Sequence, residues 1–213
     1  MPETHPIVFV LDDEQTVVVA LARMLEASGF EVRTCTSAAE FLEQHAADTP
    51  GCLVTDLRMP GMSGLELQQA LHDRGTDRAI VFITGQGDIP TTVRAMKAGA
   101  VSFLSKPVQR AELVAAVHEA LLKDATARAQ RCAHEELGRR LASLTPRERQ
   151  VLDLVASGLL NKQIAAELGA AEKTIKVHRG RIMEKMQVRT AVALVGLLSR
   201  AELRGGPHIS SVL

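Results

Sequence analysis

The first half of the chain alternates short apolar runs with amphipathic stretches of helical periodicity. The apolar runs lie at residues 7–11, 30–34, 52–55, 79–83 and 101–104. Each run is bounded by turn residues and is shorter than a typical helix, which indicates a buried strand. The helices between them are expected to end near residues 28, 45, 73 and 98, with a fifth beginning near residue 109. Five strands alternating with five helices predict a doubly wound α/β domain with a parallel sheet.

The second half has helical periodicity and predicts four helices. The first is expected to begin with Thr145 as N-cap, Pro146 at the first helical position and Glu148 completing a capping box. Asn161 is expected to cap a short second helix, and the other two are expected at about residues 172–186 and 190–203. A short helix, a turn containing glycine and a longer basic helix are typical of a helix-turn-helix.

Residues 109–142 join the two halves and contain no proline and one glycine, Gly138. The later part of this stretch is rich in good helix formers, so we expect the fifth helix to continue into a helical linker at 123–142. The alternative is a separate helix after a break near Asp124. The two domains are then expected at 1–122 and 143–204, and residues 205–213 are expected to be disordered.

Polar groups follow four of the five predicted strands. Asp12 and Asp13 follow the first strand, Asp56 the third, Thr84 the fourth and Lys106 the fifth. Parallel strands bring their carboxyl ends to one edge of a sheet, so these groups are expected to converge there. A single aspartate at a strand end is more often a cap or turn former, so the inference depends on the combined pattern.

Converging carboxylates need a counter-charge. Two unit charges about 4 Å apart repel by roughly 4 kcal/mol at an effective dielectric constant near 20. An open site of carboxylate oxygens suits Mg²⁺, which retains several waters and binds phosphate oxygens. The hydroxyl of Thr84 and the ammonium of Lys106 add a donor and a positive charge, which suits a phosphoryl group carried on a carboxylate.

Charge divides the chain in two, although the formal net charge is zero. Residues 1–123 carry 10 Lys and Arg against 16 Asp and Glu, whereas residues 124–213 carry 15 against 9. An acidic half followed by a basic half suggests a polyanionic partner for the second domain, such as DNA. The alternative is a chance distribution of solvated charge. Aromatic residues make up only 2% of the chain, which argues against base-stacking binders of single strands.

Cysteine content and hydropathy indicate the cellular compartment. Cys35, Cys52 and Cys132 are widely spaced and form no CxxC pair, which indicates reduced thiols of a cytoplasmic protein and no zinc site. We expect no signal peptide, and because no apolar run approaches about 18 residues, we also expect no membrane span.

Residues 6–122 resemble the receiver domain of two-component response regulators. The resemblance is carried by VFVLDDE, LVTDLRMPGMSGLEL, FITGQGD and AVSFLSKP. It implies a flavodoxin-like fold with strand order 2-1-3-4-5 and a sensor histidine kinase that phosphorylates Asp56. It also implies that Asp13 and Asp56 bind Mg²⁺ directly, together with the main-chain carbonyl of Arg58, and that Asp12 acts through the water shell of the metal.

The same resemblance assigns three switch residues. Lys106 would pair with the acyl phosphate, and Thr84 would hydrogen-bond a phosphoryl oxygen. The ring of Phe103 would then rotate inward behind Thr84. Phenylalanine at this position replaces the tyrosine that is frequent in the family, so any contact that needs the hydroxyl is lost.

Residues 144–202 resemble a LuxR-type helix-turn-helix of the NarL/FixJ branch, through LTPRERQVLDLVASG, NKQIAAELG and KTIKVHRGRIMEKM. The resemblance implies that the third helix enters the major groove of DNA. At about 100° per residue, Ile175, Ile182 and Met186 fall on the core face and Val177 on the opposite face, where it suits contact with a thymine methyl group. The predicted DNA-binding residues are Lys162, Lys173, Thr174, Lys176, Val177, His178, Arg179 and Arg181.

The sequence therefore predicts a phosphorylation-activated transcription regulator that dimerises on phosphorylation, binds double-stranded promoter DNA and contacts RNA polymerase. Two other functions remain open. A phosphatase of the haloacid dehalogenase type also uses a strand-end aspartate and Mg²⁺, but it needs a DxD pair on one loop, whereas Asp12 and Asp13 are adjacent. A regulator with a vestigial phosphate site is disfavoured by the intact set of Asp13, Asp56, Thr84 and Lys106.

Overall fold

The computed structural model describes residues 5–44, 48–85 and 89–202, and the chain divides into two units between residues 129 and 130. The predicted end of the second helix at residue 45, the loop residues Gly87 and Asp88, and the tail at 205–213 lie outside the described residues.

The first unit contains one parallel sheet whose strand order is β2-β1-β3-β4-β5, which confirms the predicted topology. The strands are β1 (Ile7–Leu11), β2 (Glu31–Cys35), β3 (Gly51–Asp56), β4 (Ala79–Thr84) and β5 (Ser102–Ser105). At most strand ends, the observed bound differs from the predicted one by a single residue. The sheet therefore brings the carboxyl ends of all five described strands to one edge.

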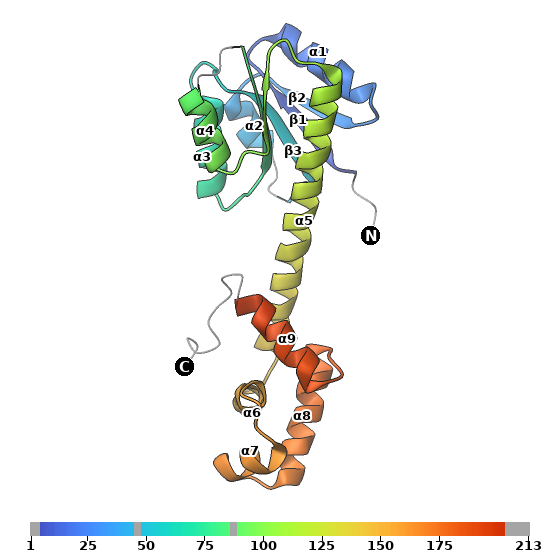
Figure 1. The fold of residues 1–213 in the computed structure, drawn as a ribbon, viewed down its shortest axis with the longest axis vertical. Helices are drawn as coiled ribbons and strands as arrows, with labels where there is room; N and C mark the ends of the chain where they lie inside the picture. The colour runs from blue at the N-terminus through green and yellow to red at the C-terminus, as the bar shows by residue number, and fades with distance from the viewer. Residues whose placement is uncertain (1–4, 45–47, 86–88, 203–213) are drawn as a thin grey trace. The chain divides into compact units, whose positions relative to one another are not determined.

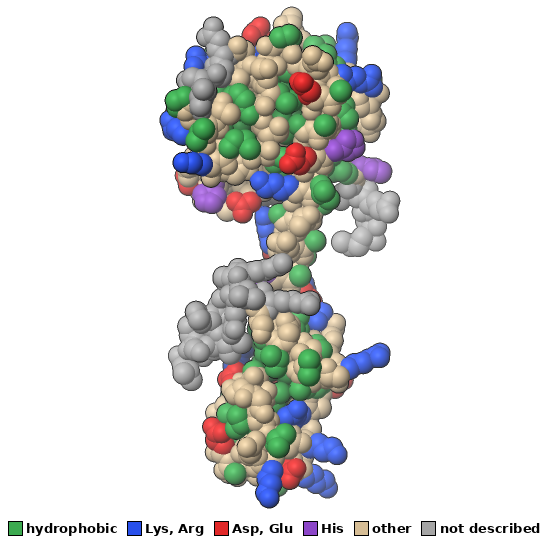
Figure 2. Space-filling view, in the orientation of Figure 1, with side chains coloured by type: hydrophobic (Ala, Val, Ile, Leu, Met, Phe, Trp, Pro, Cys, Tyr) green, Lys and Arg blue, Asp and Glu red, His purple; other side chains and the backbone are tan. Residues whose placement is uncertain are grey.

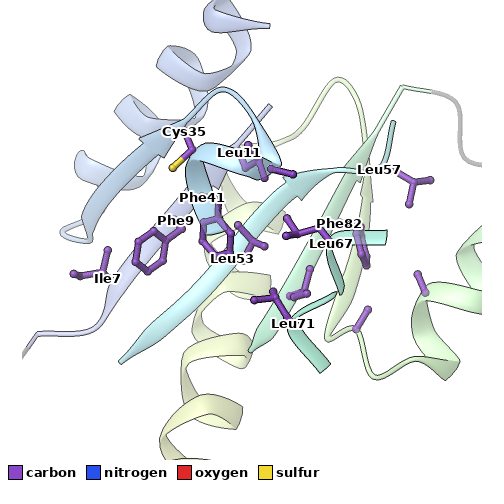
Figure 3. Close-up of a cluster of buried hydrophobic side chains, with 14 residues drawn as sticks. Ile7, Phe9, Leu11, Cys35, Phe41, Leu53, Leu57, Leu67, Leu71 and Phe82 are labelled. Carbon is purple, nitrogen blue, oxygen red and sulfur yellow. The ribbon is translucent and has the colours of Figure 1, made fainter. Parts of the chain in front are cut away.

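Helices cover both faces of this sheet (Figure 1). They are α1 (Gln15–Glu26), α2 (Ala38–Gln44), α3 (Gly64–Asp73), α4 (Ile89–Lys97) and α5 (Arg110–Ala142). Side chains of α2, α3 and α4 pack on one face, where Phe9 and Phe41 meet edge to face with ring centroids 5.4 Å apart (Figure 3). Side chains of α1 and α5 pack on the other face against alternate strand residues such as Val8 and Val54.

The second unit is a bundle of helices around one apolar core. The helices that follow α5 are α6 (Pro146–Ala156), α7 (Asn161–Glu167), α8 (Glu172–Met186) and α9 (Ala191–Glu202). The capping box of Thr145 and Glu148 is present as predicted. Asn161 is not an N-cap: Leu160 holds that position, and its N–H donates to Oε1 of Gln163 at 2.8 Å. The expected asparagine cap is therefore absent.

Helix α5 runs without a break through residues 110–142, so the predicted helical linker is confirmed. Its first turns pack on the sheet through Leu113 and Val117, whereas Leu137 is buried in the core of the second unit. The second unit is therefore built from the end of α5 as well as from the four helices that were predicted.

Cys35 and Cys52 are buried in the first unit, whereas Cys132 is exposed on α5, and all three are free thiols. Within the described residues, no helix is both long and apolar enough to cross a bilayer.

Candidate functional site

The predicted strand-end residues meet at the carboxyl edge of the sheet. Asp12 follows β1 directly, Asp56 ends β3, Thr84 ends β4 and Lys106 follows β5. The strand register sets their relative height, because Thr55 pairs with the last residue of β1 and Asp56 with the residue before Thr84. Topology alone therefore brings together groups that are far apart in the sequence.

Lys106 connects two of the carboxylates. Its Nζ donates to Oδ2 of Asp12 at 2.7 Å and to Oδ2 of Asp56 at 3.2 Å, across 94 and 50 residues of sequence. Burial alone would lower the pKa of the Lys106 ammonium, but its hydrogen bonds and charge interactions with the two aspartates outweigh burial and raise that pKa. The ammonium is thus held in its charged form at the centre of the site.

Main-chain N–H groups orient the remaining carboxylate oxygens. Oδ1 of Asp56 accepts from the N–H of Leu57 at 2.6 Å, and Oδ1 of Asp12 accepts from the N–H of Glu14 at 3.0 Å. Asp12 is only 1% exposed, whereas the Asp56 side chain retains 12% exposure. Asp56 is therefore oriented by the protein yet still accessible to a reactant.

Asp12, Asp13 and Asp56 each place a carboxylate oxygen within 4.8 Å of the others. Three hard oxygen ligands beside solvent, with Asp13 exposed, have the chemistry that Mg²⁺ requires. The donor set therefore fits the predicted metal. The N–H of Arg58 lies 3.5 Å from Oδ1 of Asp56, so its peptide is next to this cluster. The role of the Arg58 carbonyl as a ligand stays a prediction.

Thr84 and Phe103 lie on adjacent strands beside this cluster. Thr84 is 2% exposed, and its carbonyl accepts from the N–H of Lys106 at 2.7 Å. Phe103 is half-buried, with its ring centroid 6.5 Å from that of Phe82 in the core. The aromatic ring is thus in contact with the core without being enclosed by it, and its role as a switch residue stays a prediction.

Gly64 is a positioning residue that sequence reasoning missed. It begins α3, and its N–H donates to the carbonyl of Leu57 at 3.0 Å, which closes the loop after Asp56. A Cβ at Gly64 would lie 2.4 Å from the Asp56 carbonyl oxygen and 2.9 Å from a ring carbon of Phe82. The glycine therefore permits the close approach that fixes the backbone of the phospho-acceptor candidate.

Gly64→Ala is expected to lower the free energy of unfolding of the first unit by about 1–3 kcal/mol, because the added methyl group must displace the Asp56 backbone or the Phe82 ring. The shift of the urea midpoint measures this effect. Gly138→Ala is the matched control, since nothing lies within 4 Å of a Cβ at that helical position. Equal midpoints for Gly64→Ala and the wild type would contradict the steric argument.

Helix α8 presents the predicted DNA-binding surface. Ile175, Ile182 and Met186 are buried as predicted, and Val177 on the other face is 48% exposed. Lys173, Thr174, Lys176 and Arg181 are exposed on α8, Lys162 is exposed on α7, and His178 and Arg179 are half-buried. Figure 2 shows cationic side chains standing out along the side of the second unit formed by α8. An exposed valine among cations fits a groove with apolar methyl groups and anionic walls.

Helix α8 is held by an ion pair with a buried carboxylate, which sequence reasoning did not find. Nζ of Lys185 lies 2.7 Å from Oε2 of Glu148 on α6, and Glu148 is only 2% exposed. The same carboxylate accepts from the N–H of Thr145 at 2.9 Å. These interactions, led by the Lys185 hydrogen bond, lower the pKa of the Glu148 carboxyl group. The local capping signal was visible in the sequence, but a partner 37 residues away was not.

Glu148→Gln is expected to destabilise the second unit by roughly 1–2 kcal/mol at neutral pH, because Lys185, which is one third exposed, loses a buried counter-charge. A lowered folded-state pKa means that the carboxylate contributes fully above its unfolded pKa, about 4.3, and loses this contribution as the pH falls below that value. Thermal unfolding at pH 7 and near pH 3.5 should therefore show a difference between wild type and variant that shrinks in acid. The exposed Glu184→Gln is the control, and a difference independent of pH would contradict the ion-pair explanation.

Comparison with family models matches both units. Residues 8–118 match the response regulator receiver domain, and residues 142–198 match the luxR family of bacterial regulatory proteins. These ranges include the strand-end carboxylates and helix α8.

Named regulators are similar to this chain over most of its length. The chain is 46% identical over 195 residues to the transcriptional regulatory protein FixJ of Azorhizobium caulinodans, covering 92% of each chain. It is 45% identical to Nodulation protein W of Bradyrhizobium diazoefficiens, covering 90% of this chain and 85% of the relative. The solved structure of the response regulator StyR is 49% identical, with a TM-score of 0.85 over 92% of this chain and 99% of that one.

Proposed function

Because this chain belongs to the response regulators that join a receiver domain to a LuxR-type DNA-binding domain, we propose that phosphorylation of Asp56 activates it to bind promoter DNA. The observation that carries this proposal is the double contact of Lys106 with Asp12 and Asp56, with Asp13 close enough to share a cation. A carboxylate that is oriented, accessible and adjacent to both positive charge and metal ligands is equipped to accept a phosphoryl group.

The phosphodonor is the phosphohistidine of a sensor kinase. A carboxylate oxygen of Asp56 forms a bond to phosphorus as the phosphorus–nitrogen bond breaks, and the released imidazole takes up a proton from solvent. Asp12, Asp13, Asp56 and the Arg58 carbonyl would hold Mg²⁺, which neutralises charge on the phosphoryl oxygens. The ammonium of Lys106 pairs with the same oxygens. The protein modifies itself and turns over no external substrate, so it is not an enzyme in the ordinary sense.

Activation passes from the phosphoryl group to the surface of α4 and β5. Thr84 hydrogen-bonds a phosphoryl oxygen, and Phe103 moves into the space behind it. Helix α4 exposes two apolar side chains, Val93 and Met96, at 43% and 44% of their surface. Isologous contact between two copies of this surface would cover them, which gives a homodimer.

The dimer places two α8 helices at adjacent half-sites about one turn of DNA apart. Lys173, Lys176 and Arg181 would contact phosphates or guanine edges, and Val177 a thymine methyl group. The other proposed DNA contacts are Lys162, Thr174, His178 and Arg179. Bound at a promoter, the protein would contact RNA polymerase. Both the phosphodonor and the chromosome are in the cytoplasm, which is the location we assign.

The test is to treat the full-length protein with acetyl phosphate and Mg²⁺ and to follow three readouts together. We expect an acyl phosphate at Asp56, a shift from monomer to dimer by sedimentation, and a new footprint on genomic promoter fragments. Labelling without a change in DNA binding would overturn the regulatory proposal. Failure of both acetyl phosphate and a kinase to label the protein would indicate a vestigial site, and steady release of phosphate from esters would indicate a phosphatase.

A further inference from the structure

Helix α8, which carries the proposed DNA contacts, exchanges cationic side chains with the end of α5. The last four carbonyl groups of a helix have no partner within that helix. At the end of α8, the carbonyl of Met186 accepts from Nη1 of Arg140 on α5 at 3.2 Å. In return, Nζ of Lys185 on α8 donates to the carbonyl of Ser143, just after the end of α5, at 2.9 Å. Each helix therefore receives a cation from the other at its C-terminal end, where the helix dipole also favours positive charge.

Arg140 is held in place by its own helix. Its Nε donates to Oε1 of Glu136 at 2.8 Å, one turn earlier on α5, which leaves Nη1 for the Met186 carbonyl. Leu137 and Leu141 lie on the same face of α5 and pack in the apolar core of the second unit. This last part of α5 is therefore fixed to the second unit by packing and by directed hydrogen bonds.

The first turn of α8 has no comparable anchor. Ala171 is its N-cap and makes no side-chain hydrogen bond there. Within the described residues, the side-chain hydrogen bonds that join α8 to the rest of the second unit all involve its last turn. Packing of Ile175 and Ile182 in the core is not directional, so it permits small shifts of the helix. The orientation of α8 therefore depends on the polar contacts at its C-terminal end.

We propose that Arg140 is a positioning residue for DNA recognition, because its contact with Met186 fixes α8 where Lys176 and Val177 reach base edges. The inference rests on the proposed DNA-binding function of α8. It extends the DNA-reading unit into the linker helix, since Arg140 precedes the residues that match the luxR family. Base readout needs a helix held to within about 0.5 Å, whereas non-specific binding depends mainly on charge near the phosphates. Arg140 thus supports specific binding more than non-specific binding.

The test compares full-length wild type and Arg140→Met after treatment with acetyl phosphate and Mg²⁺. The probes are a promoter fragment that the wild type protects in a footprint and a fragment of the same length and composition with shuffled sequence. We expect Arg140→Met to bind the promoter fragment roughly tenfold more weakly, the factor for a lost hydrogen bond to a charged group, and the shuffled fragment with less than about twofold change. A ratio of the two affinities equal to that of the wild type would overturn the proposal.

Salt dependence separates positioning from a phosphate contact. A side chain that binds a phosphate contributes about −0.9 to the slope of log K against log salt concentration. Arg140→Met is expected to keep the wild-type slope, and a slope shallower by about 0.9 would overturn the proposal in favour of a direct phosphate contact. Arg139→Met is the matched control, because it removes a cation that also pairs with Glu136, at 2.8 Å, but contacts no group of α8 in the described part of the chain. It should bind both fragments with the affinities of the wild type.

Hydrogen exchange tests the contact itself without DNA. Arg140→Met should raise the exchange rates of the amides in the last turn of α8 roughly tenfold, and Arg139→Met should leave them unchanged. Unchanged rates in Arg140→Met would overturn the contact. If Arg140→Met does not fold, Arg140→Lys retains a cation and should lose a smaller factor in specific affinity at the same slope. A wild type that binds both fragments equally would overturn the proposed function, whereas equal loss on both fragments by Arg140→Met would overturn only the role of Arg140.

Discussion

Asp56→Asn is expected to yield a folded protein that acetyl phosphate does not label and whose affinity for promoter DNA no longer responds to the donor. The amide keeps one of the two oxygens, which can still accept from the Leu57 N–H, and Lys106 keeps its hydrogen bond to Asp12, so the fold is retained. It lacks the nucleophilic carboxylate, so no acyl phosphate forms. Coupling between two sites of a protein typically amounts to about 1–3 kcal/mol, so the roughly 5- to 150-fold gain in DNA affinity expected of the wild type should disappear.

A phosphate-affinity gel, sedimentation and a gel-shift titration on the same samples measure this prediction. Asp73→Asn is the control, because Asp73 is an exposed aspartate at the end of α3 that accepts a hydrogen bond from Gln69 and not from Lys106. It should be labelled, dimerise and bind as the wild type does. An Asp56→Asn protein that dimerises and binds promoter DNA like the phosphorylated wild type would refute phosphorylation control.

Lys106→Met is expected to lower the free energy of unfolding of the first unit by about 3 kcal/mol in the absence of Mg²⁺, because Asp12 is buried and loses its cation. Methionine retains most of the apolar length of the lysine stem, so the loss reflects charge more than packing. Mg²⁺ should restore part of the stability of the variant, since it becomes the main positive charge beside three carboxylates. The wild type should gain less from Mg²⁺, because Lys106 already compensates two of them.

The pH dependence of this effect has a definite sign. The pKa of Lys106 is raised in the folded protein, so its contribution is complete below the unfolded pKa of about 10.4 and is lost only as the pH rises through the higher folded value. Urea unfolding followed by circular dichroism should therefore give the same difference between wild type and variant from pH 6 to about pH 9. Lys97→Met on the exposed side of α4 is the control. A Lys106→Met variant with wild-type stability and wild-type response to Mg²⁺ would show that the ion pairs of Lys106 with Asp12 and Asp56 contribute nothing to stability.

The sequence predicted those parts of the site that follow from the direction of the strands in the sheet. Strand periodicity and the parallel topology were enough to bring Asp12, Asp56 and Lys106 to one edge, since strand direction decides where every strand end lies. The contact of Lys106 with both aspartates agrees with that expectation. Helix α3 likewise ends at Asp73, as predicted, and Ser63 and Glu66 fix its start through a local capping box that needs no tertiary contact.

The features that were missed depend on contacts between distant residues. The need for glycine at position 64 is visible only when the Asp56 carbonyl and the Phe82 ring are in place. The pairing of Glu148 with Lys185 follows from how α6 crosses α8, which no local pattern records. The prediction of Asn161 as the N-cap of α7 was wrong. It followed the general preference for asparagine at N-caps, whereas in the structure Leu160 holds that position and its N–H donates to the side chain of Gln163.

The distribution of the three thiols makes the protein convenient for spectroscopy. Burial, the largest effect, raises the pKa of Cys35 to about 11 and that of Cys52 to about 12, so both stay protonated and shielded from reagents at neutral pH. Cys132 is exposed on α5 and remains open to a maleimide fluorophore or a nitroxide. The natural chain thus accepts a single reporter on the helix shared by both cores, with no cysteine engineered in or removed.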